Sequence, residues 1–241
     1  MITYLGGYLQ QDKASSDGLI ELKAGLKLVQ KSFTSITSKA AYTDDEKYTL
    51  YGMFDGLNFL FGLADFKALQ SIVNEELYQG LLQICTLDKN ELQLFASAET
   101  SNEFYQLQSG SNRKHYKEFA YAFIGDIIKH PEATQDFLLF CVKTFKENMH
   151  QADGDLAKAS AALFILALCD KTNLEANKAH VATFIKGELL DIITEDQSAD
   201  KLVRFRAVWI VETFAMFLEK EDQKRVMMFY GKILPADPEA Q

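Results

Sequence analysis

The sequence contains few of the residues that interrupt helices. Only three prolines and 13 glycines occur among its 241 residues, and runs of β-branched side chains are few. Proline costs about 3 kcal/mol and glycine about 1 kcal/mol inside a helix relative to alanine, so this composition favours helix almost throughout. Hydrophobic residues make up 48% of the chain and charged residues 24%, which is ordinary for a folded globular protein. We therefore expect an all-α fold.

The sequence also lacks the usual marks of secreted and membrane proteins. No apolar run approaches the length of a membrane span, the first 20 residues do not resemble a signal peptide, and no Asn-x-Ser/Thr sequon occurs. Three cysteines are an odd number, and Cys85, Cys141 and Cys169 show no metal-ligand spacing. We interpret them as reduced core residues of an intracellular protein.

Motifs that carry catalysis are absent from the sequence as well. There is no His-Glu-x-x-His zinc motif, no phosphate-binding P-loop and no Gly-x-Ser-x-Gly nucleophile elbow. Residues 153–155, Asp-Gly-Asp, are expected to form a turn that caps the next helix. We predict no enzymatic activity, no metal and no cofactor, although a pocket joining histidines to carboxylates would favour a helical enzyme. The four histidines are scattered: His115, His130, His150 and His180.

Basic residues are fewer than acidic ones, 25 against 34, which gives a net charge of −9. That balance argues against direct nucleic-acid binding, which depends on basic surface. Residues 44–100 hold ten acidic residues against three lysines, a net charge of −7 (3 − 10). This segment is either an ordinary solvated helical face or a docking surface for a basic partner. The ten acidic residues are Asp44, Asp45, Glu46, Asp55, Asp65, Glu75, Glu76, Asp88, Glu91 and Glu99.

Start and stop signals divide the chain into helices with short polar joints. Thr43 and Glu46 have the spacing of a capping box, and Pro131 suits the first turn of a helix. We expect a flexible joint near 108–113 and a frayed tail at 235–241. The expected helices are Gly18–Phe33, Thr43–Phe61, Phe66–Thr86 as one or two helices, Arg113–His130, a helix from Pro131, Leu156–Asp170, Leu174–Thr194, Lys201–Glu219 and Asp222–Leu234.

The segment 201–220, KLVRFRAVWIVETFAMFLEK, carries two apolar arcs when it is drawn as a helix. A helix of this kind is expected to lie between neighbours on both sides. The first arc contains Leu202, Phe205, Trp209 and Met216. The second contains Val203, Ala207, Ile210, Val211, Phe214, Phe217 and Leu218.

A pattern of basic residue, alanine and aliphatic residue at i, i+3 and i+7 occurs three times. These positions share one helix face, where the alanine permits close packing and the basic side chain can reach the neighbouring repeat. The copies are 41 and 46 residues apart, which is typical of HEAT-type repeats. We predict a single HEAT-type, armadillo-like α-solenoid of stacked antiparallel helix pairs over residues 1–241; a large irregular helical bundle is the alternative. The copies are Lys117-Ala120-Ile124, Lys158-Ala161-Ile165 and Arg204-Ala207-Val211.

Two arginines of the last copy point to opposite sides of their helix, because two residues turn it by about 200°. Arg204 and Arg206 therefore do not form one anion-binding clamp. We expect Arg204 to serve packing between repeats. Arg206 is expected to face solvent, either as a contact residue or as a plain surface charge.

Two stretches resemble the importin-β (karyopherin) superfamily of nuclear transport receptors, and in particular its importin-seven/importin-eight branch. LVRFRAVWIVETFAMF (202–217) is similar to a helix in which paired basic residues, here Arg204 and Arg206, precede a small residue and a tryptophan, here Trp209. NELQLFASAETSNEFYQL (90–107) is similar to the acidic linker of that branch. The matching positions of the linker are Glu91, Leu92, Leu94, Phe95, Glu103, Phe104 and Tyr105.

This resemblance implies a HEAT superhelix that carries protein cargo through nuclear pores. Its expected partners are phenylalanine-glycine nucleoporins and protein cargo, and the acidic segment 44–100 would suit a basic cargo. Ran GTPase would act through the rest of the receptor, with no contact to membrane. The resemblance implies shuttling between cytoplasm and nucleus, and the chain resembles the middle of a longer superhelix. The alternative is a HEAT-type scaffold or complex subunit without a transport role.

Overall fold

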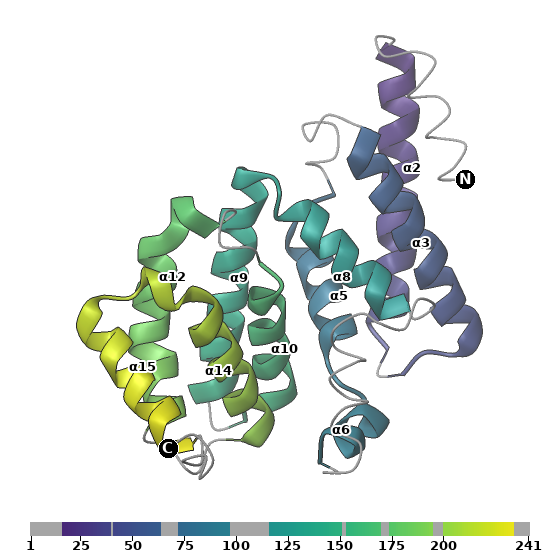
Figure 1. Cartoon of the computed structure of the whole chain (residues 1–241). Helices are drawn as coiled ribbons and strands as arrows, with labels where there is room; N and C mark the ends of the chain where they lie inside the picture. Colours follow the sequence, from purple (N-terminus) through teal and green to yellow (C-terminus); the bar gives the residue numbers. More distant parts are fainter. Residues whose placement is uncertain are drawn as a thin grey trace, which may run out of the picture. The chain divides into compact units, whose positions relative to one another are not determined.

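The computed structural model describes residues 16–39, 41–63, 72–96, 116–150, 153–169, 174–194 and 200–233. Every regular element in these ranges is a helix, which confirms the all-α prediction. The chain divides into two compact units, residues 1–140 and 141–241 (Figure 1). The joint predicted near 108–113 and the tail 235–241 lie outside the described residues.

The boundary between the two units, at residues 140 and 141, falls inside one long helix, α9 (Pro131–His150). The other helices of unit 1 are α2 (Ser16–Thr37), α3 (Asp44–Leu63), α5 (Glu75–Cys85), α6 (Lys89–Ala96) and α8 (Tyr116–Ile127). Unit 2 contains α10 (Leu156–Ala167), η1 (Glu175–Asn177), α12 (Lys178–Phe184), η2 (Ile185–Leu189), α13 (Leu190–Thr194), α14 (Lys201–Phe214), η3 (Ala215–Phe217) and α15 (Lys220–Ile233). No helix in the described ranges is long and apolar enough to span a membrane.

Several helices begin where side chains satisfy the first backbone N–H groups. The predicted capping box of α3 is present: the amide of Thr43 donates to Glu46 at 2.9 Å, and the amide of Glu46 donates to the Thr43 hydroxyl at 3.3 Å. Asp155 accepts from two amides at the start of α10, which confirms the capping turn predicted at 153–155. Asp200 does the same for α14. Pro131 is the first residue of α9, as predicted.

The core of unit 1 is built by helix pairs that run in the same direction. Gln30 of α2 donates to Asn74 and Glu76 at the start of α5, and Phe33 contacts Gly80 further along both helices. In the same way α3 packs along α8 (Figure 1). Phe54 of α3 joins the two pairs, because its ring lies 5.7 Å from those of both Phe33 and Phe123.

Gly80 allows the close approach of α2 to α5. A Cβ atom at this position would lie 2.2 Å from Cε1 of Phe33 and 3.0 Å from the hydroxyl of Thr37. Phe33 is 1% exposed, so its ring has little room to move. Only glycine fits here without displacing a core aromatic side chain.

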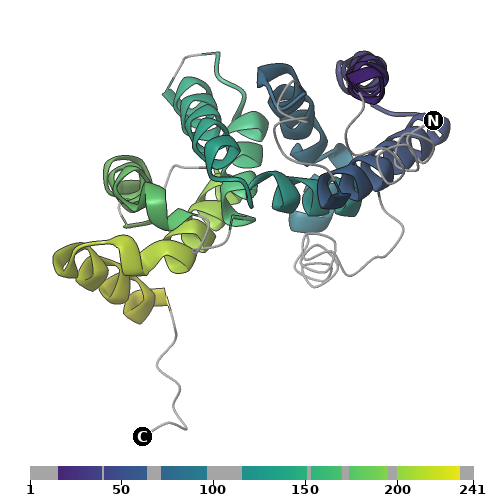
Figure 2. The same cartoon turned by 90° about the horizontal axis from the view of Figure 1, so that it is seen from above.

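Unit 2 repeats the same arrangement of neighbouring helices. α10 packs along α14, with the rings of Phe164 and Trp209 6.0 Å apart. In both views α15 lies alongside the continuous helical segment formed by α12, η2 and α13 (Figures 1 and 2). Arg225 of α15 reaches Asp191 at 3.1 Å, and Lys186 of η2 lies 3.3 Å from the buried Asp222.

The segment predicted as one helix over Leu174–Thr194 is helical but irregular. It opens with the 3₁₀ turn η1, continues as α12, and widens into the π-helical turn η2 before α13. A π turn inserts one extra residue and is often found at functional sites. Here it contains Glu188, which accepts from Lys146 at 2.9 Å and contacts His150 at 2.7 Å.

The prediction that both apolar arcs of 201–220 are covered was wrong for the first arc. Leu202 is buried, but Phe205 is 38% exposed and Met216 is 64% exposed. The second arc is largely buried, as expected. For Met216 the difference has a geometric cause: the α-helix ends at Phe214 and the 3₁₀ turn η3 follows, so a constant step of about 100° does not hold there.

Candidate functional site

Lys117 in α8 forms a buried ion pair with Glu91 in α6. The ammonium lies 2.8 and 2.6 Å from the two carboxylate oxygens, and it donates to the Thr86 carbonyl at 3.1 Å. The side chains are only 4% and 6% exposed. From the sequence, Lys117 was predicted as a repeat position and Glu91 as a family-motif position. In the structure their side chains are in direct contact.

Glu91 also fixes the start of its own helix. Its carboxylate accepts from the amide of Asp88 at 2.7 Å, and its own amide donates to the Asp88 carboxylate at 2.9 Å. This is a second capping box, with aspartate at the first position. One carboxylate therefore orients α6 and at the same time neutralises Lys117.

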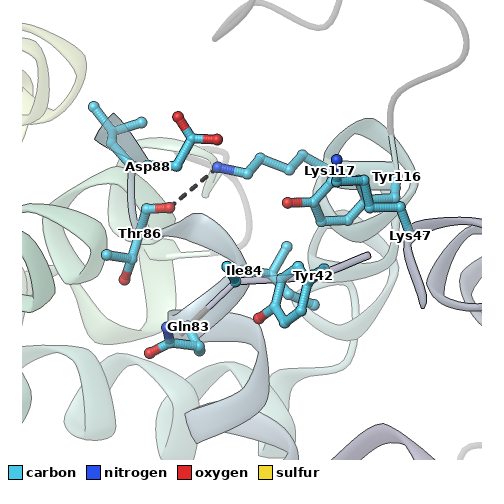
Figure 3. Close-up of a pocket in the computed structure, with 10 residues that line it drawn as sticks. Tyr42, Lys47, Gln83, Ile84, Thr86, Asp88, Tyr116 and Lys117 are labelled. Atoms are coloured by element: carbon cyan, nitrogen blue, oxygen red, sulfur yellow. Dashed lines mark hydrogen bonds between the residues drawn. The ribbon is translucent and has the colours of Figure 1, made fainter. Parts of the chain in front are cut away.

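A cavity of about 240 Å³ lies beside this ion pair. It is formed by the link before α3, the first turn of α3, the end of α5 with the following loop, and the start of α8 (Figure 3). Polar and apolar groups share its wall. The lining residues are Ala41, Tyr42, Lys47, Gln83, Ile84, Thr86, Leu87, Asp88, Tyr116 and Lys117.

Two tyrosine rings dominate the inner wall of this cavity. The rings of Tyr42 and Tyr116 meet edge to face, with centroids 5.8 Å apart and planes at 88°. Burial chiefly, with smaller contributions from Cys85 and Glu46, raises the pKa of Tyr42 to about 12. Burial, followed by the nearby carboxylates of Glu91 and Asp88, raises the pKa of Tyr116 as well. Both phenols are therefore neutral at physiological pH.

The three repeat copies share buried positions but differ in their basic residues. Ala120, Ala161 and Ala207 are all 0% exposed, as are the aliphatic residues four positions after each of them. Lys117 and Arg204 reach the segment that precedes their helix: Arg204 donates to the carbonyl of Ile193 at 3.0 Å. Lys158 instead remains near Asp155 of its own helix cap, at 3.7 Å.

Arg206 does not face solvent, so that prediction was wrong. Its side chain is 1% exposed, and its guanidinium carbon lies 4.7 Å from the centroid of the Phe164 ring in α10. A planar, weakly hydrated guanidinium can stack on an aromatic face, which makes this burial tolerable. Trp209 is half-buried and contacts the same ring. Phe164 thus contacts two of the three family-motif positions on α14, Arg206 and Trp209.

The remaining family-motif positions are only partly described. Leu92 is 38% exposed and Phe95 is half-buried on α6. Glu103, Phe104 and Tyr105 lie outside the described residues. Within the described residues, only the positions on α6 can be compared with the linker.

The acidic segment 44–100 keeps most of its charge at the surface of unit 1. Glu91 is the exception, because it is buried against Lys117. Glu46 is half-buried, and hydrogen bonds from Lys39 and from the amide of Thr43 lower its pKa to about 2. Asp65 and Glu99 are outside the described residues. The exposed carboxylates are Asp44, Asp45, Asp55, Glu75, Glu76 and Asp88.

Metal and thiol chemistry have little support in the described ranges. No group of three or more His, Cys, Asp and Glu side chains in these ranges is placed to hold a metal ion. The three cysteines are buried, and none of them is in a disulfide. Burial raises the pKa of the Cys169 thiol to about 12, so that this thiol stays protonated and unreactive.

Sequence reasoning missed Tyr42 and Asp88 as wall residues and missed Arg206 as a buried cation. A signal for Asp88 was present, because Asp88-x-x-Glu91 is itself a capping pattern. Tyr42 and the packing of Arg206 depend on contacts between distant segments.

No protein-family model and no curated protein matches this chain.

Proposed function

We propose that this protein is a binding module for other proteins, built as a HEAT-type α-solenoid and acting as a segment of a nuclear transport receptor. The observation that carries the solenoid proposal is the repeated buried alanine at 120, 161 and 207, each with its buried aliphatic partner on α8, α10 and α14. Equivalent burial at a spacing of about 40–47 residues is what stacked helix pairs require. The packing of α2 on α5 and of α13 on α15, in the same direction, agrees with it.

The transport role rests on the resemblance of 202–217 and of 90–107 to the importin-seven/importin-eight branch. A receptor segment should bind phenylalanine-glycine repeats weakly and basic cargo through charge. The exposed carboxylates of unit 1 support the second expectation. Nothing in this mechanism requires a cofactor or a chemical step.

The direct test is binding of the purified chain to immobilised phenylalanine-glycine repeats, with repeats in which serine replaces phenylalanine as control. Weak binding that disappears with serine supports the transport role. Failure to bind, together with copurification of the chain in one stable assembly from cells, would instead favour a HEAT-type scaffold subunit.

The charge component has its own test. Replacing Asp44, Asp45 and Asp55 together by lysine should weaken binding to a basic protein and flatten the salt dependence of its affinity. Unchanged binding would show that this surface is an ordinary solvated face.

A further inference from the structure

We propose that one face of α3 is the docking surface for a basic amphipathic helix of a partner protein. This outward face consists of Tyr48, Tyr51, Asp55 and Phe59 of α3 together with Phe119 of α8. The inference rests on the proposed protein-binding function, and it names one surface and the chemistry of the segment that binds there. Its basis is the exposed aromatic area, the support beneath that area and the charge around it.

The outward face exposes two large aromatic side chains. Tyr48 is 78% exposed and Phe59 is 45% exposed. They share one face with Asp55, because positions 48, 55 and 59 fall within about 40° of one another around a helix. Leu50 and Phe54 lie on the opposite side of α3 and are fully buried in unit 1. Aromatic area that stays at the surface beside polar residues is typical of protein–protein interaction sites.

The packing of α3 along α8 supports this face from beneath (Figure 1). The ring of Tyr51 meets the ring of Phe119 edge to face, with centroids 4.4 Å apart. The ring of Tyr48 stacks on Tyr51, with centroids 6.2 Å apart and planes at 22°. Asn58 donates to the carbonyl of Phe119 at 3.4 Å. Aromatic side chains that are already held in place lose little conformational entropy on binding, and such anchors supply much of the binding energy of interfaces.

The charge of the outward face favours a basic partner. Asp55 is exposed on the face, and Asp45 is exposed one turn before Tyr48. Within the described ranges, neither of these carboxylates has an ion-pair partner. Lys47 of the same helix is already paired with Asp44 at 3.0 Å. The surface therefore carries a net negative charge, which lysine and arginine side chains on a partner would complement.

The arrangement of the side chains suits a helix as the bound segment. Tyr48, Asp55 and Phe59 follow α3 for about three turns, so a partner helix can lie along them with its side chains at i, i+3, i+4 and i+7. Gly52 lies between these positions and is exposed, and a Cβ atom there would meet no atom within 4 Å. This space lets an apolar side chain of the partner approach the backbone of α3.

The test uses the full chain and a fluorescent peptide designed as a basic amphipathic helix, with binding measured by fluorescence anisotropy. Leucine forms the apolar face of the peptide, and lysine and arginine form both flanks. A second peptide has glutamine at every basic position, and a third has the same composition in scrambled order. The basic helix should bind about fivefold more tightly than either of them. Equal binding of the glutamine or the scrambled peptide would overturn the proposal.

Matched variants locate the binding surface. Tyr48→Ser and Phe59→Ser remove exposed rings, whereas Phe205→Ser removes a ring of similar exposure, 38%, from α14. Asp55→Asn removes a charge from the outward face, and Asp136→Asn makes the same change at an exposed position of α9. The variants of the face should weaken binding by about fivefold or more, and the controls by less than about twofold. Tyr48→Phe should bind like the unaltered chain, because it keeps the ring.

Equal losses in the variants of the face and in their controls would overturn the proposal, provided that thermal melts show all of them folded. Analytical ultracentrifugation of the chain alone tests a second copy as the occupant. Self-association that Tyr48→Ser abolishes would overturn the assignment to a partner protein. If the basic helix fails to bind while phenylalanine-glycine repeats still bind, the surface inference fails and the proposed function stands. If the nucleoporin repeats fail and the basic helix binds, the transport role fails and the docking surface stands.

Discussion

The ammonium group of Lys117 lies 2.6 Å from the carboxylate of Glu91, 26 residues earlier in the chain, and water reaches almost none of either side chain. Burying one of these charges alone is costly, because its partner would be left unpaired in a low-dielectric environment. The pair therefore ties α6 and the loop after α5 to α8. It stabilises the packing of unit 1, and Lys117 also lines the cavity beside it.

Removing one member of this pair should destabilise the protein strongly. We expect Glu91→Gln to lower the free energy of unfolding by about 3–5 kcal/mol, measured by urea denaturation, because Lys117 stays buried without a counter-charge. The double variant Glu91→Leu with Lys117→Met should recover much of that loss. Lys47→Met, which breaks an exposed pair, should cost less than about 1 kcal/mol. A loss for Glu91→Gln as small as that for Lys47→Met would contradict the prediction.

The glycine at the contact of α2 and α5 gives a second prediction. Gly80→Ala should lower the free energy of unfolding by about 1–3 kcal/mol, because its Cβ would collide with the buried Phe33 ring. Gly52→Ala is the matched control on α3, since a Cβ there meets no atom within 4 Å. The control should stabilise the protein by about 0.5–1 kcal/mol through the higher helix propensity of alanine. Equal effects in urea denaturation would show that α2 and α5 pack less closely than described.

The helices themselves were largely predictable because their signals are local. Thr43 with Glu46, Pro131 and residues 153–155 each mark a helix start by chemistry within four residues. The buried alanines were predictable from periodicity, since Ala120, Ala161 and Ala207 share one face with the aliphatic residue that follows. These features need no knowledge of distant contacts.

The surroundings of individual side chains were less predictable. Arg206 looked like a surface charge, because charged residues are rarely buried and the sequence does not show that Phe164 lies opposite. Met216 looked like a core residue, because the change from α to 3₁₀ geometry after Phe214 is not visible in a hydrophobic pattern. The cavity combines three distant segments, so only the fold reveals it.

The loss of unfolding free energy at acidic pH should depend on Glu46. The hydrogen bond from Lys39, followed by that from the Thr43 amide, lowers the folded pKa of Glu46 to about 2 from its ordinary value of about 4.5. A lowered pKa stabilises the folded state above about pH 4.5, and this contribution is lost as the pH falls toward 2. Glu46→Gln keeps the capping pattern and should therefore show a flatter fall in unfolding free energy between these pH values. An unchanged acid limb, measured by urea denaturation at several pH values, would contradict this assignment.

Arg206 provides the sharpest test of the corrected view of α14. Arg206→Ala should lower the free energy of unfolding by about 2–5 kcal/mol, because it leaves a cavity against Phe164 and removes a stacked cation. Arg206→Lys should be intermediate, since an ammonium lacks the planar face that stacks on the ring. Arg204→Ala is the matched control on the same helix. It removes one hydrogen bond to the Ile193 carbonyl and a longer contact with the Phe229 ring at 5.9 Å from a half-buried side chain, at an expected cost of about 1–2 kcal/mol. If urea denaturation gives equal losses for Arg206→Ala and Arg204→Ala, Arg206 faces solvent after all, and α14 presents a basic surface to partners instead of a stacked cation to α10.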